Sequence, residues 1–294
     1  MDWDRQHLAA LRAAVEHGTF DAASKALQIT PSAFSQRIRG AEQRAGSLLL
    51  TRSKPVRPTA AGEVLVQLAR QLSLLETEAQ ERLSHGGEAV TELSISLNAD
   101  SLSVWFAPVL SEIADWDQVA LRLQIEDQDL SARMLRSGEV MGAVTADPRP
   151  APGCRSQPLG VMRYLPVAHP RLLERHGVSP QRAADLARLP MVEYGPDDDL
   201  QRSLLRQLGV PPNPVSHRVP TSAEFALAVE AGLGWGVVPE QQVQGPLAAG
   251  ELVRLGSRRK VDVALYWQRW RLDSPLLERL SAVVLDAAAV LRKA

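Results

Sequence analysis

Hydrogen-bonding side chains recur on one side of the segment between residues 30 and 45. As a helix, this segment would bury apolar residues that recur at spacings of four, three and four: Phe34, Ile38, Ala41 and Ala45. The opposite face would carry polar side chains: Ser32, Ser35, Gln36, Arg39 and Gln43. Such side chains have the length and the hydrogen-bonding groups needed to reach base edges and phosphates. By itself the pattern fits a DNA-contacting helix and a small helical bundle with a solvated face equally well.

A basic loop follows this segment. A short apolar strand at 48–50 leads into a proline-containing loop at 51–59, whose cations are expected near phosphates: Arg52, Lys54 and Arg57. Thr30, the expected N-cap of the helix, and Thr59 complete the expected DNA contacts. The first 60 residues contain nine Lys and Arg against five Asp and Glu, a net +4, while the whole chain carries −1. A basic end on an acidic body fits a DNA-binding unit joined to something else.

Two polar clusters in the second half of the chain stand where helices are expected to begin. One contains Asn98, Asp100 and Ser101, and the other contains Thr221 and Ser222. Helix starts hold carboxylates or phosphates, and ligands of open α/β sheets bind beyond the carboxyl ends of the strands. Ordinary N-capping by Ser101 and Ser222 is the alternative for each cluster, but the two together favour a ligand cleft.

Other reactive groups are sparse. The single cysteine, Cys154, excludes an internal disulfide, and no Cys/His cluster suggests a metal site. No nucleophile elbow, GxGxxG loop or P-loop is present, so we expect neither an enzyme nor a cofactor. Cys154 as a redox-sensing thiol is a regulatory alternative to an inert thiol. With no signal segment and no apolar stretch long enough for a membrane span, a cytoplasmic location is expected. A solute-binding transport protein is an alternative for the second half, but it should have a secretion signal and no DNA-binding unit.

Three helices are expected to position the polar face. The first ends near Gly18 and has one apolar side: Leu8, Leu11 and Val15. A short second helix is expected to be capped by Asp21. Thr30-Pro31 is a strong helix start and Gly46 a helix end. A helix, a tight turn and a helix with a polar outer face form a helix-turn-helix arrangement, to which the basic loop would add a wing.

A long proline-free helix is expected at 61–84. Its leucines and one alanine alternate at spacings of three and four, which is typical of a coiled-coil seam: Leu65, Leu68, Leu72, Leu75 and Ala79. The seam predicts pairing with a second chain, and a helix packed on its own domain is the alternative. The glycine-containing segment at 84–87 predicts a hinge.

Strands and helices alternate after this hinge. The first set comprises strands at 93–97, 121–125 and 140–145, with helices at 101–113 and 129–136. The second set comprises a helix opened by Ser179-Pro180, a strand at 191–192, helices at 198–208 and 222–231, strands at 235–238 and 261–267, and a helix from Ser274-Pro275 to Leu291. This order predicts the α/β class, with a mostly parallel sheet covered by helices.

The stretch from His7 to Gly62 resembles the LysR-type transcription regulators. It matches their pattern at Phe20, Ala22, Ala23, Leu27, Ser35, Ile38, Glu42, Gly46, Leu50, Arg52, Thr59 and Gly62. Pro31 departs from it, because the family often has glutamine there, so the family's operator sequences do not transfer. The resemblance implies a winged helix-turn-helix at 1–60, a dimerisation helix at 61–84 and a two-lobed effector domain like that of periplasmic binding proteins. The first lobe would comprise 88–164 and 268–294, and the second 165–267.

Segments of the second half resemble the ArgP/LysG (IciA-like) branch of that family: 98–101, 126–127, 159–164 and 232–236. The branch implies lysine or arginine as effector and control of an amino-acid exporter gene, although some members inhibit replication initiation by binding the origin. A regulator of an unrelated metabolic operon is another alternative. The family also implies double-stranded DNA and RNA polymerase as partners, and a homodimer or tetramer.

For a basic amino acid, the resemblance implies two groups of ligand contacts. The carboxylate would bind at the helix starts: Asn98, Ser101, Thr221 and Ser222. The side-chain cation would bind Asp127 with Glu126, and the other acids at predicted strand ends are Asp100 and Asp147. Solvated loop acids are the alternative. Aromatic residues either line the cleft or belong to the core: Trp105, Tyr164 and Trp235.

Overall fold

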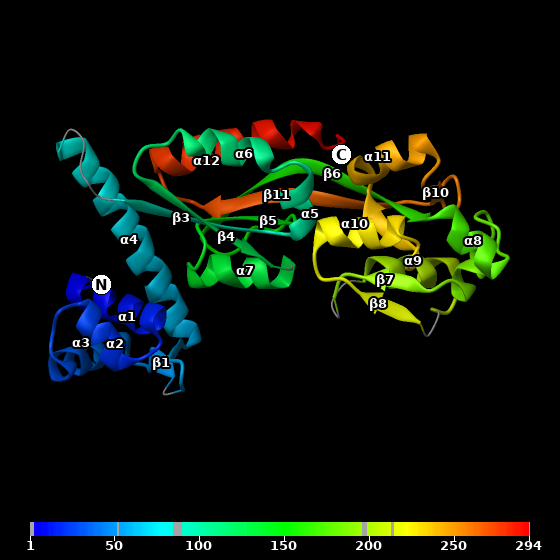
Figure 1. The fold of residues 1–294 in the computed structure, drawn as a ribbon. Helices are drawn as coiled ribbons and strands as arrows, with labels where there is room; N and C mark the ends of the chain where they lie inside the picture. Colours follow the sequence, from blue (N-terminus) through cyan, green and yellow to red (C-terminus); the bar gives the residue numbers. More distant parts are fainter. Residues whose placement is uncertain are drawn as a thin grey trace.

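The computed structural model describes residues 3–51, 53–84, 90–126, 128–195, 199–212 and 215–293. A small helical unit, drawn in blue in Figure 1, lies at one end of an elongated two-lobed α/β body. Its elements are α1 (Arg5–His17), α2 (Phe20–Ala26), α3 (Pro31–Ala45) and the antiparallel strands β1 (Leu50–Thr51) and β2 (Arg57–Pro58). The predicted order of three helices and a basic hairpin is therefore confirmed.

Side-chain caps set where these helices begin. The Oγ1 atoms of Thr19 and Thr30 accept hydrogen bonds from the backbone N–H of Ala22 and Ala33, each at 3.2 Å. The predicted start at Thr30-Pro31 is confirmed, as is the end of α3 at Gly46 in the left-handed region. The predicted Asp21 cap is wrong, because Thr19 has the extended backbone that an N-cap requires. Asp21 instead lies in the first turn of α2.

The interior of this unit fixes which face of α3 points outward. Phe34, Ile38 and Ala41 are buried, as predicted, in one cluster with residues of α1. The Phe20 ring meets the Phe34 ring edge-on, with centroids 5.1 Å apart. Burying a side chain of this size stabilises the fold by about 1.5–3 kcal/mol, so rotation of α3 about its axis would be strongly unfavourable. The polar face of α3 is held away from the core by this packing.

Helix α4 (Ala60–Ser84) belongs to two hydrophobic cores. Near its start, Leu65, Val66 and Ala69 pack into the helical unit. Further along, Leu74 packs into the core of the α/β body. The predicted seam is therefore wrong at Leu65, because this side chain is buried within the chain's own helical unit. Of the predicted hinge at 84–87, only Ser84 lies within the described residues.

The sheet of the body has the strand order β10-β6-β11-β5-β3-β4, and β9 pairs with β6 beyond that path. Its strands are β3 (Thr91–Leu97), β4 (Val119–Ile125), β5 (Gly142–Thr145), β6 (Cys154–Ala168), β9 (Gly236–Pro239), β10 (Val253–Arg254) and β11 (Val261–Trp270). Only β3 pairs in parallel with β4 and β5, while β6 and β11 run antiparallel to their neighbours. The predicted mostly parallel sheet is wrong, because these two long strands carry the chain out of the first lobe and back.

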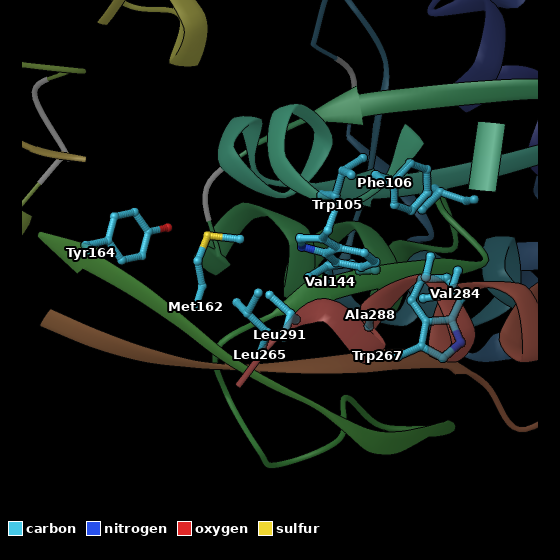
Figure 2. Packing of buried hydrophobic residues seen from close by; sticks show 14 of the residues in the cluster. Trp105, Phe106, Val144, Met162, Tyr164, Leu265, Trp267, Val284, Ala288 and Leu291 are labelled. Carbon is cyan, nitrogen blue, oxygen red and sulfur yellow. The ribbon is translucent and has the colours of Figure 1, made fainter. Parts of the chain in front are cut away.

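The first lobe is covered on both faces of the sheet. Helix α6 (Ala107–Ala114) and helix α12 (Pro275–Ala287) lie on one face, and α7 (Gln128–Ser137) lies on the other (Figure 1). The single helix predicted at 101–113 is broken into α5 (Ala99–Val104) and α6, because Trp105 and Phe106 turn into the core. Figure 2 shows these two side chains packed with Val144, Met162, Trp267, Val284 and Leu291.

In the second lobe, smaller elements pack around the C-terminal part of β6 and around β9. They are α8 (Pro170–His176), the 3-10 helix η1 (Ala183–Arg188), β7 (Met191–Glu193), α9 (Leu200–Leu208), β8 (Ser216–Arg218), α10 (Ser222–Glu230) and α11 (Glu240–Ala249). The helix predicted to open at Ser179-Pro180 is wrong, since the chain forms only the 3-10 turn from Ala183. A 3-10 turn, η2 (Ala288–Val290), follows α12 near the end of the chain. Among the described residues, no helix is long and apolar enough to cross a membrane.

Candidate functional site

The outward face of α3 presents the polar side chains that the sequence placed there. Ser32, Gln36 and Arg39 are exposed, and Ser35 is partly exposed. Thr30 is exposed as well, and its hydroxyl oxygen accepts the capping bond from Ala33. That hydroxyl still has its hydrogen, so it can donate to a phosphate oxygen. This face is free to enter a groove of DNA.

The β1–β2 hairpin follows α3 in the chain and carries exposed cations, and just before it the Leu49 N–H donates to Oε1 of Glu42 in α3 at 3.1 Å. Lys54 and Arg57 are exposed, and within the described residues no acidic partner is found for either of them or for Arg39. Unpaired exposed cations favour contacts with phosphates. Arg52, the third predicted cation of this loop, lies outside the described residues.

Thr59 is held by the fold itself. Its hydroxyl donates to the carbonyl of Leu48 at 2.7 Å and accepts from the backbone N–H of Gly62 at 3.1 Å. A threonine hydroxyl has one hydrogen, so Thr59 could donate to a phosphate only by giving up the bond to Leu48. Gly62 is needed there, because a Cβ would lie 1.9 Å from the Leu49 carbonyl oxygen. The structure thus gives Thr59 a positioning role at the start of α4.

The two predicted helix starts of the α/β body meet across the lobes. Ser222, the first residue of α10, donates from Oγ to Oδ1 of Asp100 in α5 at 2.6 Å. Gln242 of α11 donates from Nε2 to Ser222 Oγ at 3.0 Å and to Ser103 Oγ at 2.9 Å. These four side chains form an interlobe contact, defined here as Asp100, Ser103, Ser222 and Gln242. Gln242 and Ser103 were not predicted.

The capping roles at these helix starts differ from the predicted ones. Asn98, not Ser101, caps α5, because its Oδ1 accepts from the Ser101 N–H at 3.1 Å. Thr221, not Ser222, is the N-cap of α10, without a side-chain capping bond. The Thr221 hydroxyl instead bonds Glu224, which lowers the pKa of that carboxyl. Ser101 is fully buried, and its Oγ has no partner among the described residues.

Tyr194 also lies close to the interlobe contact, and the sequence reasoning missed it. Burial raises the pKa of the Tyr194 hydroxyl, and the negative charge of Asp100 raises it further. Tyr194 directly follows β7, so the rule that ligands bind beyond strand ends could have found it. The site therefore contains one carboxylate, several hydroxyls and a phenol, contributed by both lobes.

Of the remaining predicted acids, Asp147 and Glu126 form no hydrogen bond with this contact among the described residues. Asp147 follows β5 and pairs with the Arg149 guanidinium at 3.1 Å, and this hydrogen bond lowers the pKa of the Asp147 carboxyl. Its charge is thus already balanced. Glu126 follows β4 and is half-buried, with its backbone N–H bonded to the Leu97 carbonyl at 3.2 Å. Asp127 lies outside the described residues.

Cys154 and the three candidate cleft aromatics belong to the interior. Burial raises the pKa of the Cys154 thiol to about 11, so the reactive thiolate is scarce at neutral pH. A thiol in this state offers no support for a redox switch. Trp105, Tyr164 and Trp235 are all buried in the main core, so the core alternative is the one the structure favours. Within the described part of the chain, no group of three or more His, Cys, Asp or Glu could hold a metal ion.

Comparison with known proteins covers both halves of the chain. Residues 5–63 match the family described as bacterial regulatory helix-turn-helix protein, lysR family, and residues 86–289 match the LysR substrate binding domain. The lysine export transcriptional regulatory protein LysG of Corynebacterium efficiens is 46% identical over 286 residues, which cover 96% of this chain and 97% of that protein.

Two solved structures extend the similarity to three dimensions. The crystal structure of ArgP from Mycobacterium tuberculosis has a TM-score of 0.92 and 45% identity, covering 99% of each chain. Full-length LysG from Corynebacterium glutamicum, solved with bound effector Arg, has a TM-score of 0.85 and 40% identity, covering 99% of this chain and 100% of that one.

Proposed function

Because the chain belongs to the LysR family of bacterial transcription regulators, we propose that it senses lysine or arginine and controls transcription of an amino-acid exporter gene. The relative from C. efficiens is named for lysine export, and the relative from C. glutamicum was solved with arginine. The observation on this chain that best supports the proposal is the interlobe contact, where the Asp100 carboxylate meets the start of α10.

The interlobe contact offers complementary groups for a basic amino acid. The backbone N–H groups at the start of α10, with the hydroxyls of Thr221 and Ser222, suit a carboxylate, because a helix N-terminus carries partial positive charge. The carboxylate of Asp100 suits an ammonium or guanidinium group. The Ser222 hydroxyl donates to one Asp100 oxygen. The effector would replace this hydrogen bond with ones in which both partners are charged.

The proposal assigns DNA binding to the helical unit. Ser32, Ser35 and Gln36 would contact base edges in the major groove, in the manner of a recognition helix. Arg39, Lys54 and Arg57 would contact phosphates, with Arg52 added on sequence grounds alone. Double-stranded DNA would thus be held by α3 and the β1–β2 hairpin. RNA polymerase is the partner through which a regulator of this family would act on transcription.

Assembly would proceed through the part of α4 that the two cores leave uncovered. Leu75 is only partly buried, and Ala79 is exposed. These two residues lie on the C-terminal half of the predicted seam, beyond the segment packed on the helical unit. A homodimer would place two α3 helices on successive half-sites, and pairs of dimers would form a tetramer.

Titration calorimetry of the full chain with lysine and arginine tests the effector. We expect saturable binding of at least one of them, and a change in affinity for the promoter of an amino-acid exporter gene when it is bound. If an anionic or aromatic metabolite binds and neither lysine nor arginine does, the effector assignment is wrong. Family membership does not depend on this result.

A further inference from the structure

The helical unit is joined to the first lobe by α4 and α7. The Arg70 guanidinium donates from Nη1 to the carbonyl oxygen of Ser137 at 3.1 Å, and Gln67 donates from Nε2 to the carbonyl oxygen of Leu135 at 3.4 Å. Both carbonyls belong to the last turn of α7, and the Leu135 carbonyl also accepts from the backbone N–H of Gly138 at 3.3 Å. The negative end of the α7 dipole also favours a cation at this place.

Arg70 simultaneously contacts the helical unit. Its Nε lies 3.6 Å from Oε1 of Glu16 in α1, and its side chain is only 15% exposed. Arg12, which also approaches Glu16, donates from Nη1 to Ser73 Oγ at 2.7 Å. Burial lowers the pKa of Arg70, but a guanidinium remains protonated in proteins. One buried cation therefore links α1, α4 and α7.

The backbones of α4 and the segment after α7 lie in close contact beside an open cavity. Gly138 has a φ of +76°, and a Cβ there would lie 2.9 Å from the Cα of Gln67. Next to this contact is a cavity of about 580 Å³, whose lining includes Arg12, Arg70 and Glu139. Leu74 of α4 lines this cavity and packs into the core of the α/β body, so apolar packing and the polar contacts of Arg70 and Gln67 together set the orientation of the helical unit.

The other end of α7 points toward the interlobe contact. Helix α7 follows β4, and β4 runs parallel to β3, so both strands end at the sheet edge where Asp100 lies. Ser96 of β3 and Ser131 of α7 are joined through their hydroxyls at 2.8 Å, and both are buried. A helix of ten residues spans about 15 Å, so α7 reaches rigidly from the cleft side of the lobe to Arg70.

We propose that Arg70 positions the DNA-binding unit on the first lobe, and that effector binding between the lobes alters DNA binding through the contacts of Arg70 with Ser137 and Glu16. This inference rests on the proposed function and adds to it the route of regulation. The effector must favour one arrangement of the junction over another, because equal affinity for both would shift nothing. The contact with Ser137 is the one by which the two arrangements would differ.

The first experiment measures DNA affinity with and without arginine or lysine in the full chain. Effectors of allosteric proteins typically change affinity by about 5- to 150-fold, and we expect the change in Arg70→Met to fall below about twofold. Arg70→Lys, which keeps the charge and a donor, should restore part of it. Calorimetry should show that both variants still bind the effector saturably, because Arg70 is not part of the interlobe contact.

Arg5→Met is the matched control. Arg5 also joins α1 to α4, through Glu76 at 2.6 Å, but among the described residues it contacts nothing in the first lobe. Its effector response should equal that of the wild type. An Arg70→Met protein that responds to effector as strongly as the wild type would overturn the inference. If DNA affinity falls equally with and without effector, Arg70 serves folding or DNA binding alone, and the inference is again wrong.

A second measurement needs no effector. Spin labels can be attached to cysteines introduced at two exposed positions, Ser47→Cys in the helical unit and Ser111→Cys in the first lobe. Native Cys154 is buried and its thiol pKa is raised, so it should resist labelling. With excess unlabelled protein added, the distance distribution should be narrow in the wild type and broader or shifted in Arg70→Met. Identical distributions would refute the positioning role. If no basic amino acid binds the wild type, the proposed effector and the regulatory route are both wrong. The distances between the spin labels would still test the positioning role of Arg70.

Discussion

Among the predicted acids, Asp100 is the one that the structure shows in a hydrogen bond between the two lobes. Asp147 was an equal candidate in the sequence, since both acids follow predicted strands. The structure separates them, because Arg149 balances the charge of Asp147 whereas Asp100 meets the hydroxyl of Ser222. A carboxylate at the contact between the lobes is placed to form charge-assisted hydrogen bonds with a cationic ligand bound there.

We therefore expect Asp100→Asn to weaken binding of lysine or arginine about tenfold or more, since a charge-assisted hydrogen bond contributes about 1.5–3 kcal/mol. Binding of a neutral amino acid of similar length should change little. Calorimetry on the full chain measures both. Asp147→Asn is the matched control and should bind normally. If Asp147→Asn is the weaker binder, the cation site lies at the end of β5.

Prediction from the sequence found Asp100 and Ser222 but not the other residues around their contact. Both stand at helix starts, which the sequence pattern reveals. Gln242 and Ser103 became visible only when the second lobe was placed against the first, because no local signal marks a helical glutamine that faces a cleft. Tyr194 follows a strand, so the rule on strand ends could have found it. The same limit applies to Thr59, whose hydroxyl is directed inward by a carbonyl eleven residues away.

For elements, α3 and the β1–β2 hairpin are expected to divide the work of DNA binding. Arg57→Ala should weaken binding to all sequences and reduce the slope of log affinity against log salt concentration by about 1, because one phosphate contact is lost. Gln36→Ala should mainly reduce discrimination between operator and unrelated DNA. Fluorescence anisotropy at several salt concentrations measures both. Equal effects of the two variants on the salt slope would contradict this division.

Helix α4 carries the prediction on assembly. Leu75→Glu would place a carboxylate against its symmetry mate in a dimer, where an unpaired buried charge is strongly unfavourable. Sedimentation should show smaller species than the wild type forms. Gln80→Glu, which adds the same charge to an exposed position off the seam, should leave assembly unchanged. Should Leu75→Glu assemble normally, the subunits meet through another surface.

Elements were predicted well where the pattern was regular and local. The helices of the first unit follow from the spacing of their apolar residues and from caps such as Thr30, and the strand at 93–97 follows from alternating apolar residues. Strand β6 was missed over most of its length, because Pro158 and Gly160 interrupt its pattern and its burial changes as it passes between lobes. The antiparallel pairing of β6 with β11 is set by tertiary contacts, so the order of elements alone predicted too parallel a sheet.

For the whole molecule, the pairing of β6 with β11 determines how firmly the lobes are joined. Arg163 and Asp262 are partners in this register and form two hydrogen bonds, at 2.7 and 2.9 Å. The hydrogen bond from Arg163 is the main reason that the pKa of Asp262 falls from 3.8 to about 2. A carboxyl with a depressed folded-state pKa stabilises the fold above its unfolded pKa. That stability is lost as the pH falls through the folded pKa.

Asp262→Asn should therefore lower the free energy of unfolding at pH 7, by about 1 kcal/mol once solvent screening of this partly exposed pair is allowed for. The difference from the wild type should shrink as the pH falls from 4 to 2. Denaturant titrations across this range measure it. Asp21→Asn, which removes an exposed pair with Lys25, should change stability less at every pH. A difference that grows toward acid pH would contradict the assignment.

Because α4 belongs to two hydrophobic cores, the two halves of the chain are expected to unfold together. Leu65 and Leu74 lie on one continuous helix, and Glu78 accepts a hydrogen bond from the backbone N–H of Leu276 near the start of α12 at 3.3 Å. Neither half can melt without exposing part of the surface that this helix covers in the other. Heating should thus produce one cooperative transition, not two independent ones. A body cut free before residue 90 would also lack Leu74 and the Glu78 carboxylate, so its melting temperature should fall below that of the intact chain.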